Sequence, residues 1–123
     1  IDDAAQLWDG LRDQTNEFFV DASDGASLWR LSVPPTTPSL RIKGEQLIEW
    51  GGAQRWLRTD ADASTMRQAA NAVGGHATLF HGNDKSAGVF QPLAPQVAAI
   101  HRNLKNAFDP AGIFNRGRMY TEI

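Results

Sequence analysis

The sequence predicts an α+β domain in which an antiparallel sheet carries helices on one face. Two kinds of segment support this: stretches whose apolar residues alternate as in strands, and stretches with helical spacing. Their order along the chain is helix, strand, hairpin, helix, strand, helix. A split ferredoxin-like arrangement fits this order best. The length of 123 residues suits one domain with a single core.

Residues 3–19 are predicted to form one amphipathic helix. Apolar and small residues recur there at helical spacing, namely Ala4, Leu7, Trp8, Leu11, Thr15 and Phe18. Asp2 and Asp3 suit the positive end of this helix. The helical pattern then breaks at Asp21, Ser23, Asp24 and Gly25.

Residues 27–33 alternate as a strand does. Trp29, Leu31 and Val33 share one face, whereas Leu28, Arg30 and Ser32 share the other. Three prolines, Pro34, Pro35 and Pro38, end the strand. The chain from there to Gly44 is therefore predicted to be an extended connection.

The Gly51-Gly52 pair, between residues 46–50 and 53–58, predicts a two-residue hairpin. Closing this hairpin pairs Trp50 with Ala53 and Leu47 with Trp56. One face then carries Ile48, Trp50, Ala53, Arg55 and Leu57, and the more polar opposite face carries Leu47, Glu49, Gln54, Trp56 and Arg58.

A second helix is predicted over residues 61–73, with Met66, Ala69, Ala70 and Val73 inward and Gly74 as its stop. Residues 76–81 form a short apolar strand, and 82–88 form a loop. The last helix spans residues 95–107, with Val97, Ile100, Leu104 and Ala107 on one side. Pro95 suits its first turn, and Pro110 prevents its continuation.

Composition excludes several functions. Twelve basic and fourteen acidic residues give a net charge of −2, so no overall field favours nucleic acid or an anionic membrane. The absence of cysteine excludes disulfides and Cys-ligated iron–sulfur clusters. No apolar run is long enough to cross a membrane, and no signal peptide is visible, so we expect a cytoplasmic location. The chain begins with Ile1 rather than Met, and we expect it to be a piece of a longer protein.

The sequence contains no nucleophile elbow, phosphate-binding glycine loop or metal motif with the right spacing. His76 and His81 are five residues apart on a strand and point to opposite faces, so they are not expected to ligate one metal. His101, beside Ile100 and Leu104, is expected to be a packing residue rather than an acid or base.

Arg30 is the strongest candidate for a functional side chain. A buried, unpaired guanidinium is costly, so Arg30 must meet an anion or water. Three interpretations remain open: an exposed arginine, an ion pair with Glu49 or an aspartate, and a bidentate clamp for a substrate carboxylate.

The most informative segment is the C-terminal run from Phe108 to Tyr120. The helix stops at Asp109-Pro110, and the chain turns at Gly112 and again at Gly117. Asn115, Arg116 and Arg118 present an amide and two guanidinium groups there. Taken alone, the segment could equally be a tail that packs back on its own domain.

This run resembles the C-terminal signature of FAD-linked oxidases of the vanillyl-alcohol-oxidase type, through the pattern Phe108-Asp109-Pro110-x-Gly112-Ile113-x-Asn115-x-Gly117-Arg118. Residues 28–34, 49–57 and 74–80 resemble, more narrowly, the FAD-binding (E) subunits of bacterial glycolate oxidases. The similarity covers most of the chain.

The resemblance implies a two-part flavoprotein whose N-terminal FAD-binding domain lies outside this chain. Residues 1–107 would be the cap, or substrate-side, domain, and residues 108–123 a tail that returns to the flavin domain. Asn115 would approach the isoalloxazine edge of FAD, Gly117 would allow close backbone passage, and Arg118 would lie near polar groups of the cofactor. Arg30 would be the catalytic-site residue that binds the substrate carboxylate.

The implied reaction is oxidation of a 2-hydroxy acid, glycolate to glyoxylate, with hydride transfer to the flavin. The isolated fragment is expected to be inactive. The implied partners are sister flavin and iron–sulfur subunits of a glycolate oxidase complex, through which the protein would attach peripherally to the inner membrane. Whether this subunit turns over substrate or only relays electrons is left open.

Two departures from the family pattern qualify these expectations. The usual proline after Asn115 is Arg116, which loosens the turn. The His-rich metal motif of related catalytic subunits is reduced to Gly75-His76, so no metal site is expected. A non-catalytic assembly module is the alternative function, with Leu47, Glu49, Trp56 and Arg58 forming an interface.

Overall fold

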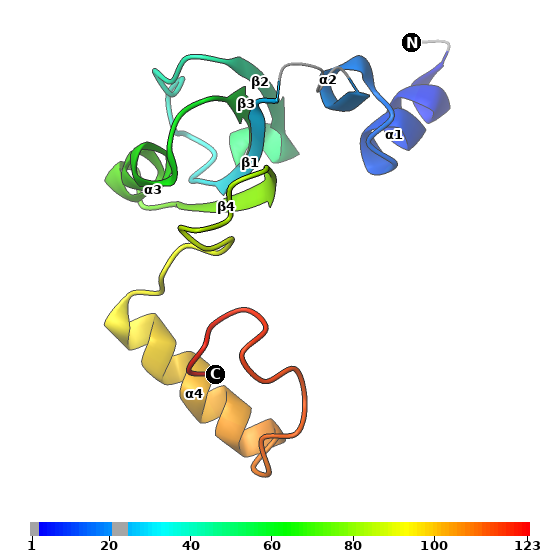
Figure 1. Ribbon diagram of the computed structural model, residues 1–123. Helices are drawn as coiled ribbons and strands as arrows, with labels where there is room; N and C mark the ends of the chain where they lie inside the picture. The colour runs from blue at the N-terminus through cyan, green and yellow to red at the C-terminus, as the bar shows by residue number, and fades with distance from the viewer. Residues whose placement is uncertain (1–2, 21–24) are drawn as a thin grey trace.

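The computed structural model describes residues 3–20 and 25–123, and it confirms the α+β class. Its centre is a four-stranded antiparallel sheet in the order β2-β3-β1-β4 (Figure 1). The strands are β1 (Ser27–Ser32), β2 (Glu45–Glu49), β3 (Gln54–Thr59) and β4 (His76–His81). β1 lies between β3 and β4 and pairs with both. This is the strand order of a split ferredoxin-like sheet.

The predicted hairpin is confirmed, including its register. Leu47 pairs with Trp56, and Glu49 pairs with Gln54. The chain turns through a short 3-10 helix, η1 (Trp50–Gly52), where Gly51 and Gly52 have φ angles of +60° and +97°. The Ala53 N–H donates to the Trp50 carbonyl at 3.1 Å, which closes the two-residue turn.

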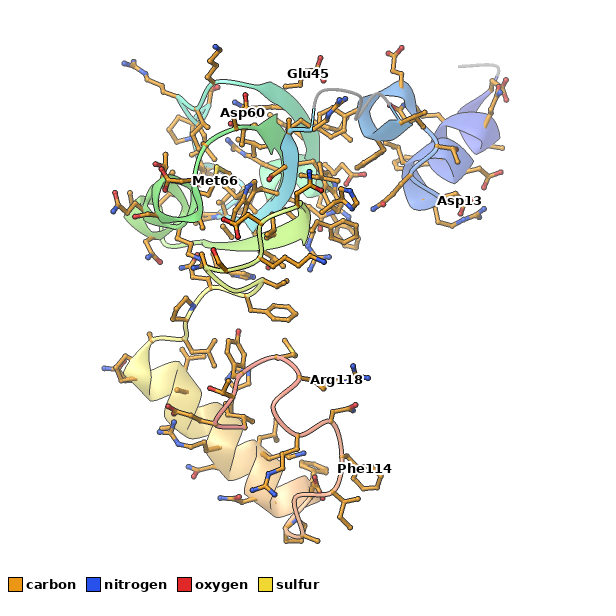
Figure 2. The ribbon with its side chains drawn as sticks, in the orientation of Figure 1. Asp13, Glu45, Asp60, Met66, Phe114 and Arg118 are labelled. Atoms are coloured by element: carbon orange, nitrogen blue, oxygen red, sulfur yellow. The ribbon has the colours of Figure 1, made fainter. Side chains whose placement is uncertain are left out.

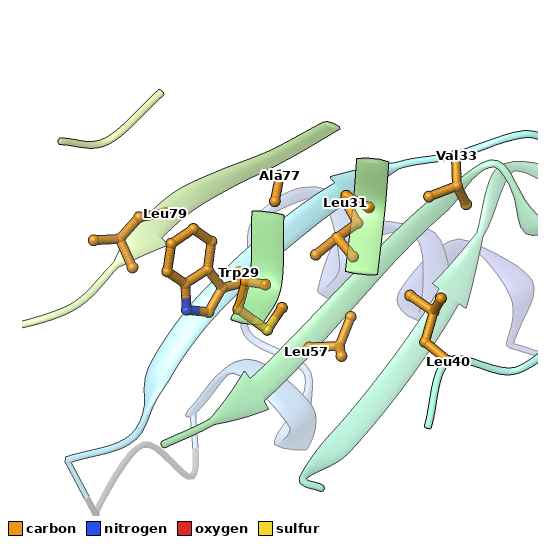
Figure 3. Close-up of a cluster of buried hydrophobic side chains, with 9 residues drawn as sticks. Trp29, Leu31, Val33, Leu40, Leu57, Ala77 and Leu79 are labelled. Carbon is orange, nitrogen blue, oxygen red and sulfur yellow. The ribbon is translucent and has the colours of Figure 1, made fainter. Parts of the chain in front are cut away.

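Helix α3 (Ala63–Ala72) covers one face of the sheet. Asp62 caps it by accepting the Thr65 N–H at 2.9 Å, and Met66 and Ala70 are buried beneath it. The predicted inward residues of β1 lie in the same core. The buried cluster, most of it labelled in Figure 3, is Trp29, Leu31, Val33, Leu40, Leu57, Met66, Ala70, Ala77 and Leu79.

The connection between β1 and β2 is extended, as predicted, and forms no helix. Instead, Leu40 enters the core, and the 3% exposed side chain of Arg55 reaches this connection. Its guanidinium donates to the Pro38 carbonyl at 2.8 Å and to the Thr37 carbonyl. An irregular segment therefore covers part of the sheet face, with a buried arginine satisfying its carbonyl groups.

The prediction of a single helix over residues 3–19 is wrong. The chain forms α1 (Ala4–Arg12) and a short α2 (Glu17–Val20). Between them, Gln14 adopts a φ of +56°, and the backbone N–H groups of Thr15 and Asn16 donate to the Gly10 carbonyl. The Asn16 side chain then accepts the Phe18 N–H at 2.9 Å and starts α2. The expectations for Asp2, Asp21, Ser23 and Asp24 fall outside the described residues.

The last helix, α4 (Pro95–Phe108), has the predicted bounds to within one residue, with Pro95 in its first turn. It lies away from the sheet, with the C-terminal tail beside it (Figure 1). None of its residues is buried, because α3 and the 33–44 connection already cover the sheet face. Within the described ranges, no helix has both the length and the apolar character to span a membrane.

Candidate functional site

Arg30 lies in the middle of β1, on the sheet face opposite α3. Trp29 and Leu31, its neighbours in sequence, are buried in the core, whereas Arg30 is exposed. Its cross-strand partners are Trp56 on β3 and Thr78 on β4. The predicted alternation of faces is therefore confirmed, and it presents this guanidinium on the open face of the sheet.

Aromatic side chains form a row on this face. The rings of Trp56 and Phe80 meet edge to face, with centroids 4.9 Å apart, and Phe19 of α2 meets Trp56 in the same way at 5.3 Å. The Arg30 Cζ lies 5.9 Å from the centroid of Phe80, within the range of a cation–π contact. Arg30, whose strand lies between the strands of Trp56 and Phe80, is thus placed beside a packed aromatic row.

The ion pair between Arg30 and Glu49, one of the interpretations that the sequence left open, does not form. The Glu49 carboxylate accepts the Trp56 Nε1–H at 2.6 Å and the Gln54 Nε2–H at 3.0 Å through the same oxygen. Across residues 3–20 and 25–123, no ion pair involves Arg30. Its guanidinium is exposed, with its hydrogen-bond donors available to an external anion.

The residues proposed for the alternative interface are only partly accessible. Trp56 and Arg58 are 5% and 7% exposed. Arg58 donates to the Phe18 carbonyl at 3.1 Å and pairs with Glu45 at 3.2 Å. Two of the four residues of the proposed interface are therefore buried within the chain itself. Fewer residues on this face are accessible to a partner than the sequence indicated.

Two cavities are lined in part by Arg58. One, of about 230 Å³, borders Phe80, Leu28 and the α2 residue Phe19. A larger one, of about 670 Å³, is lined by Gly44 and Thr65 as well as by Arg58. Arg30 lines neither cavity, so its position on the open face, rather than an enclosed pocket, defines the candidate site.

Asp109 organises the start of the C-terminal tail, a role that the sequence analysis missed. Its carboxylate accepts the N–H groups of Ile113 and Phe114 at 3.0 and 2.9 Å, and Lys105 approaches it at 2.6 Å. Lys105 also donates to the Phe114 carbonyl. Lys105, followed by the two backbone amides, lowers the pKa of Asp109 to about 2. An acidic side chain directly after a helix, facing the N–H groups of the next turn, was the available signal.

The turn that carries Asn115, Gly117 and Arg118 forms even though Arg116 replaces the usual proline. The Arg118 N–H donates to the Asn115 carbonyl at 3.1 Å, and Gly117 has a φ of +69°. Asn115 itself has a φ of +48°, and the side chains of Asn115 and Arg118 are exposed. Exposed amide and guanidinium donors on one turn suit a polar group of FAD as a ligand, so the residues present fit the cofactor.

Residue 117 is a glycine because of the backbone conformation that the turn requires there. A Cβ built on it would meet no atom within 4 Å, and its N–H donates to the Ile123 carbonyl at 2.9 Å. The positive φ alone accounts for a glycine here. Close passage of a cofactor past Gly117 stays a prediction.

Arg30 and the tail residues do not come together in this chain. The tail lies along α4, where Tyr120 contacts Phe90 and His101 at ring distances of 6.0 and 6.3 Å. Figure 2 places Phe114 and Arg118 beside α4, away from the sheet. The roles of Arg30, Asn115, Gly117 and Arg118 therefore stay predictions.

The histidines do not belong to a cluster of potential metal ligands. In the described part of the chain, no group of three or more His, Cys, Asp or Glu side chains could hold a metal ion. His76 and His81 are exposed at the two ends of β4. His101 is also exposed, and its Nδ1 lies 2.9 Å from the Val97 carbonyl one turn earlier.

Comparison with known proteins confirms the resemblance seen in the sequence. The chain is 44% identical over 120 residues to the glycolate oxidase subunit GlcE of Escherichia coli (strain K12). The match covers 98% of this chain and 33% of the relative, so the chain spans about a third of that subunit's length. No family model and no solved structure matches the chain.

Proposed function

We propose, from this similarity to a glycolate oxidase subunit, that the chain is the cap domain of an FAD-dependent subunit that oxidises 2-hydroxy acids such as glycolate. The observation that carries the proposal is the 44% identity, which extends over 98% of the chain. Identity at this level over nearly every residue supports a shared fold and shared chemistry. Residues 1–107 form the cap and residues 108–123 the tail that returns to the flavin domain.

In the proposed site, Arg30 binds the substrate carboxylate. Its guanidinium is exposed on the open sheet face and has no ion-pair partner among the described residues. A planar guanidinium makes two parallel hydrogen bonds to a carboxylate, which fixes the orientation of a small acid. This binding places the substrate C–H bond in a defined direction for hydride removal.

The tail residues Asn115 and Arg118 would hold the cofactor, and Gly117 would keep the turn between them in its left-handed conformation. When bound, FAD supplies the hydride acceptor for oxidation of the 2-hydroxy acid to the 2-oxo acid. The contribution of this chain is to bind the substrate, to orient it and to exclude water from the flavin.

The same relative supports assembly with sister subunits. The protein named in the match is a subunit of glycolate oxidase. We therefore propose that the full-length protein assembles with sister flavin and iron–sulfur subunits on the cytoplasmic side of the inner membrane. In such a complex, its flavin either turns over substrate directly or relays electrons from a partner subunit.

One observation favours a second candidate, an assembly module without a catalytic role. The apolar side of α4 is exposed: Ile100 is 64% and Leu104 54% accessible, and Phe108 at its end is 82% accessible. Large apolar side chains exposed along one helix favour an interaction site. Under this alternative, Arg30 substitutions leave turnover unchanged, whereas α4 substitutions disrupt the complex.

The experiment that tests the proposed function is the visible absorption spectrum of the purified full-length protein, before and after anaerobic addition of glycolate. A flavin band that bleaches supports substrate oxidation at this subunit. A band that persists supports an electron-relay role. If no band appears, even after reconstitution with excess FAD, the cofactor assignment is wrong and the assembly module is the better account.

A further inference from the structure

We infer that Phe80, supported by Trp56 and Glu49, is a positioning residue that holds the Arg30 guanidinium ready for a carboxylate. The inference rests on the proposed role of Arg30 and extends it to side chains that the sequence did not single out for this purpose. It is carried by four contacts on the open face of the sheet.

The first contact is between Arg30 and Phe80. An exposed arginine on a strand samples many rotamers and loses that freedom when it binds a ligand. The Phe80 ring, 5.9 Å from the Arg30 Cζ, attracts the guanidinium. A phenyl ring attracts the cation without using up its N–H groups as a carboxylate would, so they remain available for bidentate bonding.

The second contact fixes Phe80. Phe80 is 45% exposed and could reorient by itself, but its ring meets the Trp56 ring at 90° and 4.9 Å. This edge-to-face geometry is the preferred one for aromatic pairs. Trp56 is 5% exposed and is also packed edge to face by Phe19, so it cannot move easily.

The third and fourth contacts hold Trp56 in place and engage the carboxylate of Glu49. Glu49 accepts the indole N–H at 2.6 Å, a charge-assisted bond that orients the Trp56 ring. Gln54 donates to the same Glu49 oxygen at 3.0 Å. Glu49 is the acidic residue that the sequence analysis named as a possible ion-pair partner of Arg30, and these two donors engage its carboxylate. The array therefore holds Arg30 in place and also keeps it unpaired.

The array spans the whole sheet. Glu49 lies on β2, Trp56 on β3, Arg30 on β1 and Phe80 on β4. The strands are hydrogen-bonded to one another in that order, so the relative positions of the four side chains are set by backbone pairing. A site built on paired strands keeps its geometry better than one built on loops.

The test measures glycolate turnover by the full-length protein purified with its partner subunits. Phe80→Leu is expected to raise KM for glycolate by about threefold to fivefold, the size of an exposed cation–π contact, and to leave kcat within about twofold. Phe80→Tyr keeps the ring and is expected to restore KM. Trp50→Leu removes an 80% exposed aromatic residue at the hairpin turn and serves as the matched control, with no change expected.

A double-mutant cycle separates positioning from a general structural effect. If Phe80 acts through Arg30, then Phe80→Leu changes KM by less than about twofold in an Arg30→Gln background, which removes the cation. An unchanged KM in Phe80→Leu, together with a raised KM in Arg30→Lys, would overturn the positioning role and leave the proposed function intact. An unchanged KM in Arg30→Lys would overturn both. Should Phe80→Leu fail to fold, Phe80→Met, which keeps more of the side-chain volume, takes its place in the cycle.

Discussion

The sheet region, residues 27–81, and the C-terminal region, residues 95–123, are stabilised in different ways. The sheet region has a continuous core in which Leu31, Leu57 and Met66 are fully buried. Helix α4 has no buried residue, and its apolar side faces outward. The difference indicates that burial of apolar side chains stabilises the sheet region, whereas it contributes little to holding α4 in this chain.

Both regions nevertheless use one polar side chain to hold an irregular segment. In the sheet region, the Arg55 guanidinium donates to the carbonyls of residues 37 and 38. In the C-terminal region, the Asp109 carboxylate accepts the amides of residues 113 and 114. A cation gathers carbonyl oxygens and an anion gathers N–H groups, so each segment keeps its backbone satisfied without forming a helix or strand.

The largest effect is expected from Gly44→Ala in the sheet region. Gly44 has a φ of +132°, and a Cβ there would lie 2.1 Å from the Arg58 carbonyl oxygen. Because the clash is with backbone, we expect a loss of about 4 kcal/mol in the free energy of unfolding, measured by urea denaturation. Gly88→Ala, at a φ of +79° with no neighbour closer than 4.0 Å, is the control and should cost only about 1 kcal/mol. Equal losses in the two variants would contradict the close approach at Gly44.

Truncating one leucine in each region tests whether the sheet region and the C-terminal region are stabilised differently. Leu57→Ala in the core should destabilise this chain by about 3 kcal/mol, because it leaves a cavity. Leu104→Ala on α4, where the side chain is 54% exposed, should change stability by less than about 0.5 kcal/mol. Thermal or urea unfolding followed by tryptophan fluorescence measures both. In the full-length protein, Leu104→Ala should lower the free energy of unfolding by markedly more than it does in this chain. An equal loss in the two proteins would mean that α4 packs against no other surface.

The smallest expected effect is a local loss of stability around Asp109 in the C-terminal region at low pH. The pKa of Asp109 is lowered to about 2 in the folded chain, below its usual value of about 3.9. The stabilisation that the ionised Asp109 carboxylate contributes is therefore complete above about pH 4 and is lost as the pH falls through about 2. The backbone N–H signals of Ile113 and Phe114 should shift in NMR spectra with a midpoint near pH 2, and Asp109→Asn should abolish this titration. A midpoint near pH 4 would show that the contacts with Lys105 and the two amides do not form.

Sequence patterns predicted the sheet region well because its elements are set by short-range rules. The alternation around Trp29 and Leu31 follows from strand geometry, and the Gly51-Gly52 pair defined both the hairpin and its register. The α+β class followed from these elements.

The parts that the sequence did not predict depend on contacts between distant or ambiguous residues. The break between α1 and α2 depends on Gln14 adopting a positive φ, a conformation that its residue type does not favour. Arg55 acts through the backbone carbonyls of residues 37 and 38, which no side-chain pattern identifies. Of the candidate site, the exposure of Arg30 was predictable from alternation, but its contact with Phe80 required the pairing of β1 with β4.

The central claim is that Arg30 binds the carboxylate of a 2-hydroxy acid at a flavin-dependent site. The most direct measurement is an anaerobic titration of the full-length protein with glycolate, which follows bleaching of the flavin band in the wild type and in Arg30→Lys. Losing the bidentate, charge-assisted contact should raise the glycolate concentration needed for half-maximal bleaching by about tenfold or more. The same concentration dependence in both proteins would contradict the assignment of Arg30.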